Sequence, residues 1–154
     1  MDKTLSMRKM EERDRAEVTE MMRVFYSSDA VHTDGSDEIF ERDISECVSD
    51  SPFAEGFVFP APSGDGLLGY AMLAHSFSTE YGMHCVWVED IYLKEEARGK
   101  GLASVFFDYV HSAFPGSLVR LEAEYENEHA MDVYKSKGFS EMPYAELYRK
   151  PENR

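Results

Sequence analysis

A pair of adjacent carboxylates in the middle of the chain could perform acid–base chemistry. Glu89 and Asp90 interrupt the β-branched and aromatic run 86–93, whose composition predicts a buried strand. Burying a carboxylate among apolar residues is costly unless the group has a partner or a purpose. Because neighbouring strand residues point to opposite faces, each face receives one carboxylate unless a bulge intervenes. The pair therefore supplies either a general base or structural hydrogen-bond acceptors.

A glycine-bearing turn follows this strand and could bind an anion. The run Arg98-Gly99-Lys100-Gly101 directly precedes a helix that apolar spacing predicts over 102–113. The first backbone N–H groups of a helix lack intrahelical partners, and the helix dipole places partial positive charge there. Glycines leave those N–H groups open to a ligand, and the two cations add charge. A pyrophosphate fits such a turn; the alternative is a solvated basic turn.

Three motifs in order resemble those of the GNAT N-acetyltransferases. The run R-G-K-G-L-A at 98–103 matches [Q/R]-x-x-G-x-[G/A], the acetyl-CoA pyrophosphate loop of that family. Upstream, V-E-D-I-Y-L at 88–93 is similar to the central strand of the spermidine/spermine and thialysine acetyltransferase branch. Downstream, Asn127, Tyr134 and Gly138-Phe139 follow the pattern N-x6-Y-x3-G-F. The resemblance covers about residues 67–139.

The resemblance implies roles for individual residues. Glu89 matches the glutamate proposed as the base, and Tyr134 matches the tyrosine that acts as general acid near the thioester sulfur. Structural alternatives remain for both: Glu89 could hold hydrogen bonds, and Tyr134 could pack against the core. The residues that the resemblance assigns to acetyl-CoA are Ile91, Tyr92, Leu93, Arg98, Gly99, Lys100, Gly101, Leu102, Ala103, Ser104, Asn127 and Tyr134.

The spacing of apolar and breaker residues predicts one α/β or α+β sheet covered by helices. The GNAT resemblance implies that the sheet is mixed, mostly antiparallel, and splayed at the cofactor site. The first helix is expected to begin with a capping box of Asp14 and Glu17. Strands are expected at 5–10, 56–59, 67–77, 86–93 and 118–123, with one or two more in 139–150, and helices at 15–26, 37–48, 102–113 and 130–137.

Composition narrows the class of protein. The 154 residues suit a single domain, 1–154, and the net charge of −14 argues against nucleic acid or an anionic membrane as a partner. An acidic surface is compatible with a cationic acceptor such as a polyamine, or serves solubility alone. Two distant cysteines, Cys47 and Cys85, and no signal-like N-terminus predict a cytoplasmic protein. Five scattered histidines predict no metal site.

The predicted function is transfer of an acetyl group from acetyl-CoA to a primary amine by direct attack. The resemblance favours a small-molecule acceptor, namely a polyamine, a diamine or a thialysine-like amine. Two alternatives stay open: a protein N-terminal or lysine acetyltransferase, and a catalytically silent coenzyme-binding module. The resemblance also implies a homodimer, for which the aromatic-rich segment 139–148 offers apolar area.

Overall fold

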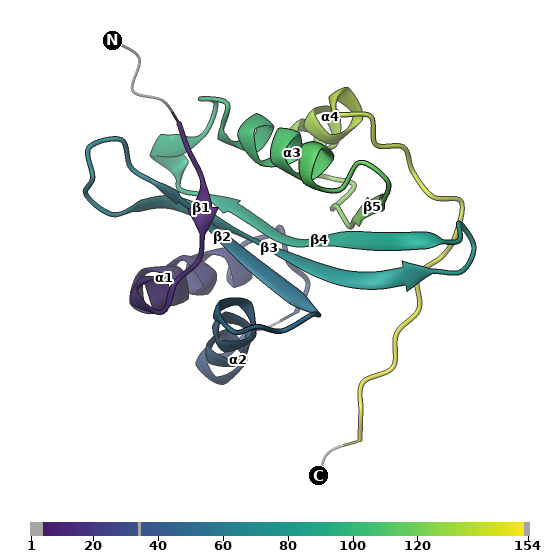
Figure 1. Cartoon of the computed structure of the whole chain (residues 1–154), viewed down its shortest axis with the longest axis horizontal. Coiled ribbons are helices and arrows are strands. Elements are labelled where there is room, and N and C mark those ends of the chain that lie inside the picture. Colours follow the sequence, from purple (N-terminus) through teal and green to yellow (C-terminus); the bar gives the residue numbers. More distant parts are fainter. Residues whose placement is uncertain (1–4, 34, 153–154) are drawn as a thin grey trace.

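A five-stranded sheet forms the central layer of the computed structural model, which describes residues 5–33 and 35–152. Helices α1 and α2 lie on one face of the sheet, and α3 and α4 lie on the other (Figure 1). The strands are β1 (Arg8–Lys9), β2 (Ala54–Pro60), β3 (Leu67–Ser78), β4 (Met83–Leu93) and β5 (Leu118–Leu121), and the helices are α1 (Arg15–Tyr26), α2 (Asp37–Val48), α3 (Leu102–Ala113) and α4 (Glu128–Ser136).

The strand order is β1-β2-β3-β4-β5, which confirms the expected mixed sheet. Strands β1 to β4 pair antiparallel in sequence order, whereas β4 and β5 are parallel and are joined through α3. Gly69 on β3 faces Leu93 on β4, and a Cβ at Gly69 would lie 2.2 Å from the Tyr92 carbonyl oxygen. This glycine therefore permits the close backbone approach that a glycine within a strand predicts.

Two apolar cores sandwich the sheet. The core under α3 joins Phe57, Leu73 and Val88 of the sheet to Phe106 and Val110 of the helix. The core under α1 and α2 joins a second set of side chains: Val18, Met22, Ile44, Tyr70 and Met72. Burial of both faces holds β2, β3 and β4 rigidly between the helices and fixes the register of the strands.

A β-bulge interrupts β4 at Glu89. Met72 on β3 faces Asp90, and the next residue, Leu73, faces Val88, so Glu89 has no partner on β3. An extra residue of this kind shifts the side-chain alternation of a strand by one position. Before the bulge, even-numbered residues such as Val88 face the α3 core; after it, the even-numbered Asp90 faces α1. The bulge thus decides where each carboxylate points.

The sheet opens directly after the bulge. Pairing between β4 and β5 runs from Cys85–Leu118 to Val88–Leu121 and then stops. Beyond this last pair, residues 89–93 continue as β4 while the chain leaves β5, so the two strands diverge (Figure 1). This is the expected splay. It places Glu89 and Glu122, the first residue after each last pair, at the point of divergence.

The predicted helices are confirmed at 15–26, 37–48 and 102–113, and α4 begins two residues earlier than expected. Two strand predictions are wrong. Only Arg8–Lys9 of the expected 5–10 strand pairs with β2. Residues 139–152 contain no strand, because they run past the free edge of β5 without joining its hydrogen-bond ladder. None of the helices in the described ranges has the length and hydropathy needed to cross a membrane.

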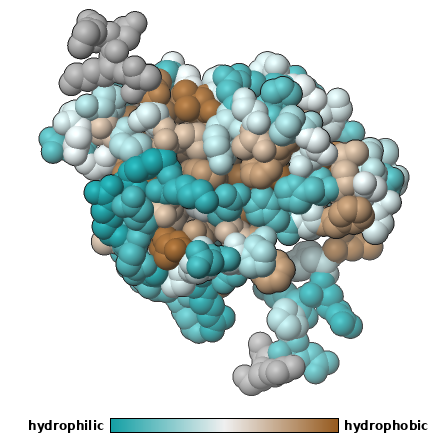
Figure 2. All heavy atoms as spheres, viewed as in Figure 1, coloured by the Kyte–Doolittle hydropathy of each residue, from teal (hydrophilic) through white to brown (hydrophobic). Residues whose placement is uncertain are grey.

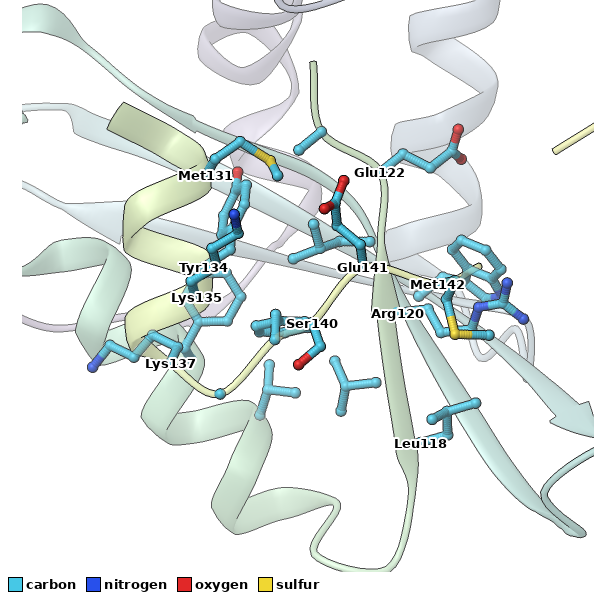
Figure 3. A pocket seen from close by; sticks show the side chains of 18 of the residues that line it. Leu118, Arg120, Glu122, Met131, Tyr134, Lys135, Lys137, Ser140, Glu141 and Met142 are labelled. Carbon is cyan, nitrogen blue, oxygen red and sulfur yellow. The ribbon is translucent and has the colours of Figure 1, made fainter. Parts of the chain in front are cut away.

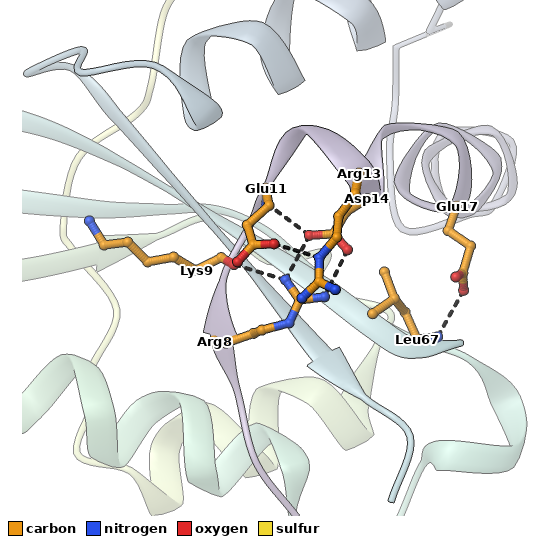
Figure 4. Close-up of polar contacts among 7 residues, drawn as sticks. All are labelled: Arg8, Lys9, Glu11, Arg13, Asp14, Glu17 and Leu67. Carbon is orange, nitrogen blue, oxygen red and sulfur yellow. Dashed lines mark hydrogen bonds and ion pairs between the residues drawn. The ribbon is translucent and has the colours of Figure 1, made fainter. Parts of the chain in front are cut away.

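The predicted capping box of Asp14 and Glu17 is also wrong. A capping box lies one turn earlier, between Glu11 and Asp14, and starts a short 3-10 helix at 12–14. The Asp14 carboxylate accepts two hydrogen bonds of 2.8 Å from the Arg8 guanidinium and one from the Glu11 N–H (Figure 4). Glu17 instead accepts a hydrogen bond of 2.8 Å from the Leu67 N–H at the start of β3. Both carboxylates therefore bind α1 to the sheet.

Replacement of Asp14 by Asn should lower the free energy of unfolding at pH 7 by about 1.5–3 kcal/mol, the range for hydrogen bonds to charged groups. Burial acts to raise the pKa of Asp14, but the Arg8 and Glu11 bonds outweigh it and hold that pKa below its usual range. A depressed carboxyl pKa stabilises the fold above the unfolded value of about 3.9, and this contribution disappears as the pH falls through the lower folded value.

Urea unfolding of the two proteins at pH 7 and near pH 3 checks this expectation. The difference between wild type and Asp14→Asn should be largest at pH 7 and should shrink in acid. Asp50→Asn, an exposed carboxylate on the α2–β2 connection, is the matched control and should change stability by less than about 0.5 kcal/mol. Equal stability of wild type and Asp14→Asn at pH 7 would contradict the prediction.

Candidate active site

The turn between β4 and α3 exposes a set of backbone donors. Gly99 and Gly101 have φ values of +74° and +91°, a left-handed conformation that favours glycine. The first helical hydrogen bond runs from the Val105 N–H to the Gly101 carbonyl, so the N–H groups of 102–104 have no partner earlier in the helix. No atom lies within 4 Å of a Cβ built at either glycine. The turn can therefore accept the oxygens of an anionic group.

The two cations of the turn differ in role. The Arg98 Nε donates a hydrogen bond of 3.0 Å to the Leu93 carbonyl at the end of β4. This bond ties the turn to the strand, so Arg98 positions the turn as well as adding charge. Lys100 is exposed between the two glycines. The predicted pyrophosphate-loop residues, 98–104, thus lie together at the N-terminus of α3.

The neighbouring part of β4 has a free backbone edge. Residues 91–93 pair with β3 on one side, but pairing with β5 ends at Val88. Ile91, Tyr92 and Leu93 are half-buried and lie between the splay and the turn that begins at Arg98. An unpaired strand edge offers N–H and C=O groups that can pair with an extended ligand, as in added-strand recognition.

Asp90 is a buried structural acceptor. Its residue is 5% exposed, and its carboxylate accepts hydrogen bonds from the hydroxyls of Tyr26 at 2.9 Å and Tyr70 at 2.7 Å. Burial raises the pKa of Asp90, and the two tyrosine bonds act against that rise. Of the two adjacent carboxylates, Asp90 thus fills the structural role that the sequence left open.

Glu89, by contrast, is exposed at the bulge. Loss of hydration raises the pKa of its carboxyl, and the negative charges of Asp90 and Glu146 raise it further. A raised pKa brings a carboxylate closer to the range in which a general base works best at neutral pH. Glu89 therefore combines access from solvent with altered acidity, which is the pattern of residues at functional sites.

A third carboxylate, Asp43 on α2, belongs to the same electrostatic group. Burial, followed by the charges of Asp90 and Glu89, raises the pKa of Asp43 to about 6. Asp43 is half-buried, although it lies on a helix with many exposed acidic residues. Its place three residues after the buried Phe40 is a signal of this orientation, because residues three apart share a helix face.

Glu122 was missed by the sequence predictions. Burial, hydrogen bonding to Glu146, and the charges of Glu146 and Glu89 together raise the pKa of Glu122 to about 7. Glu122 follows Leu121, the last residue of β5 that pairs with β4. Ligands commonly bind at the carboxyl ends of parallel strands, so a glutamate near the end of the predicted strand 118–123 was a usable signal.

Tyr134 projects from α4 toward the sheet. Its ring packs edge-to-face against Phe107 of α3 and Phe139, with ring centroids 5.8 and 6.3 Å apart. Gly138, at φ +93°, ends α4, and the Gly138 and Phe139 N–H groups donate to the carbonyls of Lys135 and Tyr134. Burial raises the pKa of the Tyr134 hydroxyl, which keeps it protonated at neutral pH. The Tyr134 ring therefore packs against the core while its hydroxyl keeps a proton that it can donate.

Asn127 caps α4. Its side-chain oxygen accepts a hydrogen bond of 3.2 Å from the Ala130 N–H. This is the usual bond of an asparagine at a helix start, so Asn127 has a structural role, and its predicted coenzyme contact stays a prediction. Nearby, His32 from the α1–α2 connection contacts the Glu124 side chain of the β5–α4 connection. This contact joins the α1–α2 connection to the β5–α4 connection.

A cavity of about 1260 Å³ lies beside β5. Tyr134 and Met131 of α4 line one side, and Arg120 and Glu122 line the side of β5, with Glu141 between them (Figure 3). The cavity therefore joins the predicted acid Tyr134 to the Glu122 carboxylate. Neither the turn 98–104 nor Glu89 is among the residues that line the cavity.

Comparison with known proteins identifies the family. The model of the family described as "Acetyltransferase (GNAT) family" matches residues 15–139. The chain belongs to the GNAT acetyltransferase family. Over 88 residues it is 35% identical to "Thialysine N-epsilon-acetyltransferase" of Bos taurus, a match that spans 55% of this chain and 51% of the bovine protein. The chain thus matches about half the length of that relative.

Solved structures show the same fold across nearly the whole GNAT chain. A possible acetyltransferase from Clostridium difficile 630 has a TM-score of 0.79 at 16% identity and covers 97% of this chain and 99% of its own. The aminoglycoside N-acetyltransferase AAC(6')-Iy in complex with CoA has a TM-score of 0.77 at 18% identity, covering 96% and 95%. At such low sequence identities, the similarity to these structures shows the fold alone.

The histidines of this GNAT chain are less scattered than the sequence predicts. His75 contacts Glu55 at 2.6 Å and His84 at 2.9 Å, and His84 contacts the Ser117 hydroxyl at 2.6 Å. The two imidazole rings stack at the end of the sheet away from the bulge. Across 5–33 and 35–152, no three His, Cys, Asp or Glu side chains are grouped so as to hold a metal ion.

The raised pKa of Glu122 predicts a pH-dependent stability. A folded-state pKa of about 7, above the ordinary 4.5, means that the native state binds more protons than the unfolded chain between these values. The free energy of unfolding should therefore fall as the pH rises through this window. Glu122→Gln should remove part of this decline, so that its melting temperature exceeds that of wild type at pH 8 but not at pH 4.5.

Calorimetric melting curves from pH 4.5 to pH 8 test this prediction. Glu128→Gln, an exposed carboxylate in the first turn of α4, is the control and should keep the wild-type pH slope. A Glu122→Gln protein with the same slope as wild type would show that Glu122 is not the group responsible.

Proposed function

We propose that this protein transfers the acetyl group of acetyl-CoA to a primary amine of a small cationic molecule. The observation that supports the proposal best is the position of Glu89. A bulge places this carboxylate where β4 and β5 diverge, on the strand whose following turn opens α3 with free backbone donors. Membership of the GNAT family supports acetyl transfer to an amine as the type of reaction.

The residues of the turn suit the coenzyme. The free N–H groups of 102–104, together with Arg98 and Lys100, would hold the pyrophosphate, and the open edge of 91–93 would pair with the pantetheine arm. Two left-handed glycines keep Cβ atoms away from these donors. Acetyl-CoA supplies the acetyl group as a thioester, which is the activated form that an amine can attack.

Glu89 removes a proton from the amine. An alkylamine has a pKa of about 10.4 and is protonated at neutral pH, whereas only the neutral amine attacks a carbonyl. The Glu89 carboxylate, directly or through water, accepts that proton as the new C–N bond forms. Tyr134, kept protonated by burial, gives its proton to the sulfur as the C–S bond breaks. The two residues thus move one proton each, in opposite directions.

A group of carboxylates favours a cationic acceptor. Burial raises the pKa values of Asp43, Glu89 and Glu122, and the charges of neighbouring carboxylates raise them further, so negative charge is in excess at this place. A second ammonium group on the acceptor would relieve this excess, which fits a diamine, a polyamine or a thialysine-like amine. The name of the bovine relative, a thialysine acetyltransferase, supports the same class.

Acetyl-CoA should stabilise the protein against heat. At a ligand concentration one hundred times Kd, binding to the native state adds about 2.7 kcal/mol, which raises the melting temperature by several degrees. Gly101→Val should abolish the shift, because a β-branched residue does not adopt φ +91° without moving the turn. Gly116→Ala, a glycine outside the left-handed region with open space around it, should keep the shift.

Thermal shift assays with acetyl-CoA, with the unliganded melting temperature of each variant as a check on folding, measure these effects. If Gly101→Val does not fold, the milder Gly101→Ala variant takes its place. If that variant does not fold either, Lys100→Ala changes the turn without altering its backbone. A folded Gly101→Val protein with the full wild-type shift would place the coenzyme elsewhere.

Kinetics should separate the roles of Glu89 and Tyr134. Glu89→Gln should lower the rate about 10²–10⁴-fold at pH 7, and raising the pH should restore part of it, because the acceptor then loses its proton unaided. Tyr134→Phe should lower kcat by a similar factor, with the KM for acetyl-CoA near normal, because the lost interaction exists mainly in the transition state. Exposed controls, Glu96→Gln and Tyr81→Phe, should retain wild-type rates.

Measuring kcat, KM and melting temperature for all four variants across pH 6.5–9.5 distinguishes catalysis from structure. A structural role would lower the melting temperature and leave turnover of the folded protein unchanged. A Tyr134→Phe enzyme with wild-type kcat would remove that residue from the mechanism.

The acceptor itself is tested by the release of free thiol from acetyl-CoA. Diamines, polyamines and thialysine should give turnover, and monoamines of equal length should give a higher KM because they lack the second charge. Turnover only with peptide N-termini or lysine peptides would replace the small-molecule acceptor by a protein. Absence of turnover with every amine, despite a thermal shift with acetyl-CoA, would indicate a silent coenzyme-binding module.

A further inference from the structure

Asp90 is a buried carboxylate that two neutral hydroxyls hold in place. Hydrophilic residues make up much of the face seen in Figure 2, and in the described part of the chain the buried acidic residues are Asp14 and Asp90. The Arg8 guanidinium pairs with Asp14. Asp90 instead accepts hydrogen bonds from the hydroxyls of Tyr26 at 2.9 Å and Tyr70 at 2.7 Å. Because a buried charge is costly without such bonds, these two hydroxyls restrict where Asp90 can lie.

Strand β4 has an alternative register, in which it continues past Val88 without the bulge. The pairing of Leu73 with Val88 is common to both registers. Continued regularly, this pairing would set Glu89 opposite Met72, whereas the bulge sets Asp90 there. A shift of one residue moves each later side chain to the other face of the sheet. In the regular register Asp90 would therefore point into the α3 core, away from the hydroxyls that bind it.

The apolar residues after the bulge do not choose between these registers. Ile91 and Leu93 pack against the α3 core, and Tyr92 packs on the α1 side. All three side chains are large and apolar enough to be buried on either face, so an exchange of faces changes the buried apolar area little. The carboxylate does discriminate. Asp90 keeps two donors in the bulged register, and in the regular register it would lose both while remaining in the interior.

Other aromatic side chains hold the two tyrosine rings in place. Tyr70, which is 0% exposed, packs edge-to-face against Phe25 of α1 with ring centroids 6.4 Å apart, and its ring centroid lies 6.1 Å from that of Tyr92. The Tyr26 ring packs edge-to-face against Phe25 at 5.4 Å. Fixed rings keep both hydroxyls at one point on the α1 face of the sheet. Binding a carboxylate there therefore costs little further side-chain entropy.

We propose that Tyr26 and Tyr70 are positioning residues for acetyl transfer. By binding Asp90 they select the bulged register of β4, and the bulge holds the Glu89 carboxylate in the opening between β4 and β5. The two tyrosines act on the reaction only through this register. The selection of the register stands on the contacts of Asp90, whereas its effect on catalysis rests on the proposed function, in which Glu89 is the base.

NMR contacts between the backbones of β3 and β4 test the register without requiring turnover. In the wild type they should connect Ala71 with Ile91. The double variant Tyr26→Phe/Tyr70→Phe removes both hydroxyls and leaves both rings, so a second set of contacts should appear that connects Ala71 with Asp90. Wild-type contacts alone in this variant would overturn the proposal. If circular dichroism shows the double variant to be unfolded, Tyr70→Phe is measured in its place, with the same two outcomes.

A double-mutant cycle separates positioning from general stability. Tyr70→Phe should lower kcat about 10- to 10²-fold and leave the KM for acetyl-CoA near normal, because a base misplaced by about 1 Å loses up to about 10² in rate. In the Glu89→Gln background the same change should lower kcat no further, because the base that it positions is already absent. Tyr109→Phe, which removes a hydroxyl from a ring packed on Phe57 in the α3 core, is the control and should keep the wild-type kcat and register.

Two kinetic results would refute the positioning role. One is a Tyr70→Phe enzyme with wild-type kcat, and the other is a cycle in which the losses from Tyr70→Phe and Glu89→Gln multiply, as they would for a residue that acts through stability alone. A wild-type rate for Glu89→Gln would instead contradict the proposed function. The NMR contacts would then still decide whether the tyrosines select the register.

Discussion

One unpaired residue in a strand determines the arrangement of this molecule. Glu89 has no partner on β3, and its insertion reverses the alternation of every later side chain of β4. Asp90 thereby enters the α1 side of the sheet, where Tyr26 and Tyr70 bind it, while Ile91 and Leu93 continue the α3 core. The pairing of β4 with β5 ends at the residue before the bulge. The opening between β4 and β5 thus coincides with the bulge and with the exposed carboxylate.

The same arrangement concentrates negative charge where an ammonium group is expected to bind. Burial raises the pKa of Asp43 to about 6 and that of Glu122 to about 7, and the charges of neighbouring carboxylates from β4 and from the segment after α4 add to these shifts. Holding these carboxylates together costs stability in the absence of a cation. This cost is consistent with the tendency of functional sites to keep groups that destabilise the fold. A cationic acceptor would remove the repulsion on binding.

Much of the fold was predictable because the sequence reports local structure. Helices α1, α2 and α3 follow from apolar spacing, and the turn at 98–101 follows from two glycines between a strand and a helix. Glu89 was identifiable as a carboxylate in an apolar run. The bulge was not predictable, because it is a property of the register between two strands, and a single strand's sequence does not state its partner.

Other features depended on contacts between distant residues. Glu122 and Glu146 lie 24 positions apart, and nothing in the local sequence indicates that their carboxyl groups interact. Asp14 has the residue type of a helix cap, yet Arg8 and the Glu11 amide bind its carboxylate. The apolar residues of 139–150 led to the prediction of one or two strands there, but in this structure the segment passes β5 without pairing. These differences arise from tertiary context overriding local preference.

The central claim is that the donor binds in the opening between β4 and β5, across the N-terminus of α3. Hydrogen–deuterium exchange of the backbone amides, measured with and without saturating CoA, tests it most directly because it locates binding without requiring turnover. The account predicts slower exchange in 91–93 and 102–104, with little change in α2 or in the loop 49–53. Unchanged exchange in 91–104, with protection confined to another part of the chain, would contradict it.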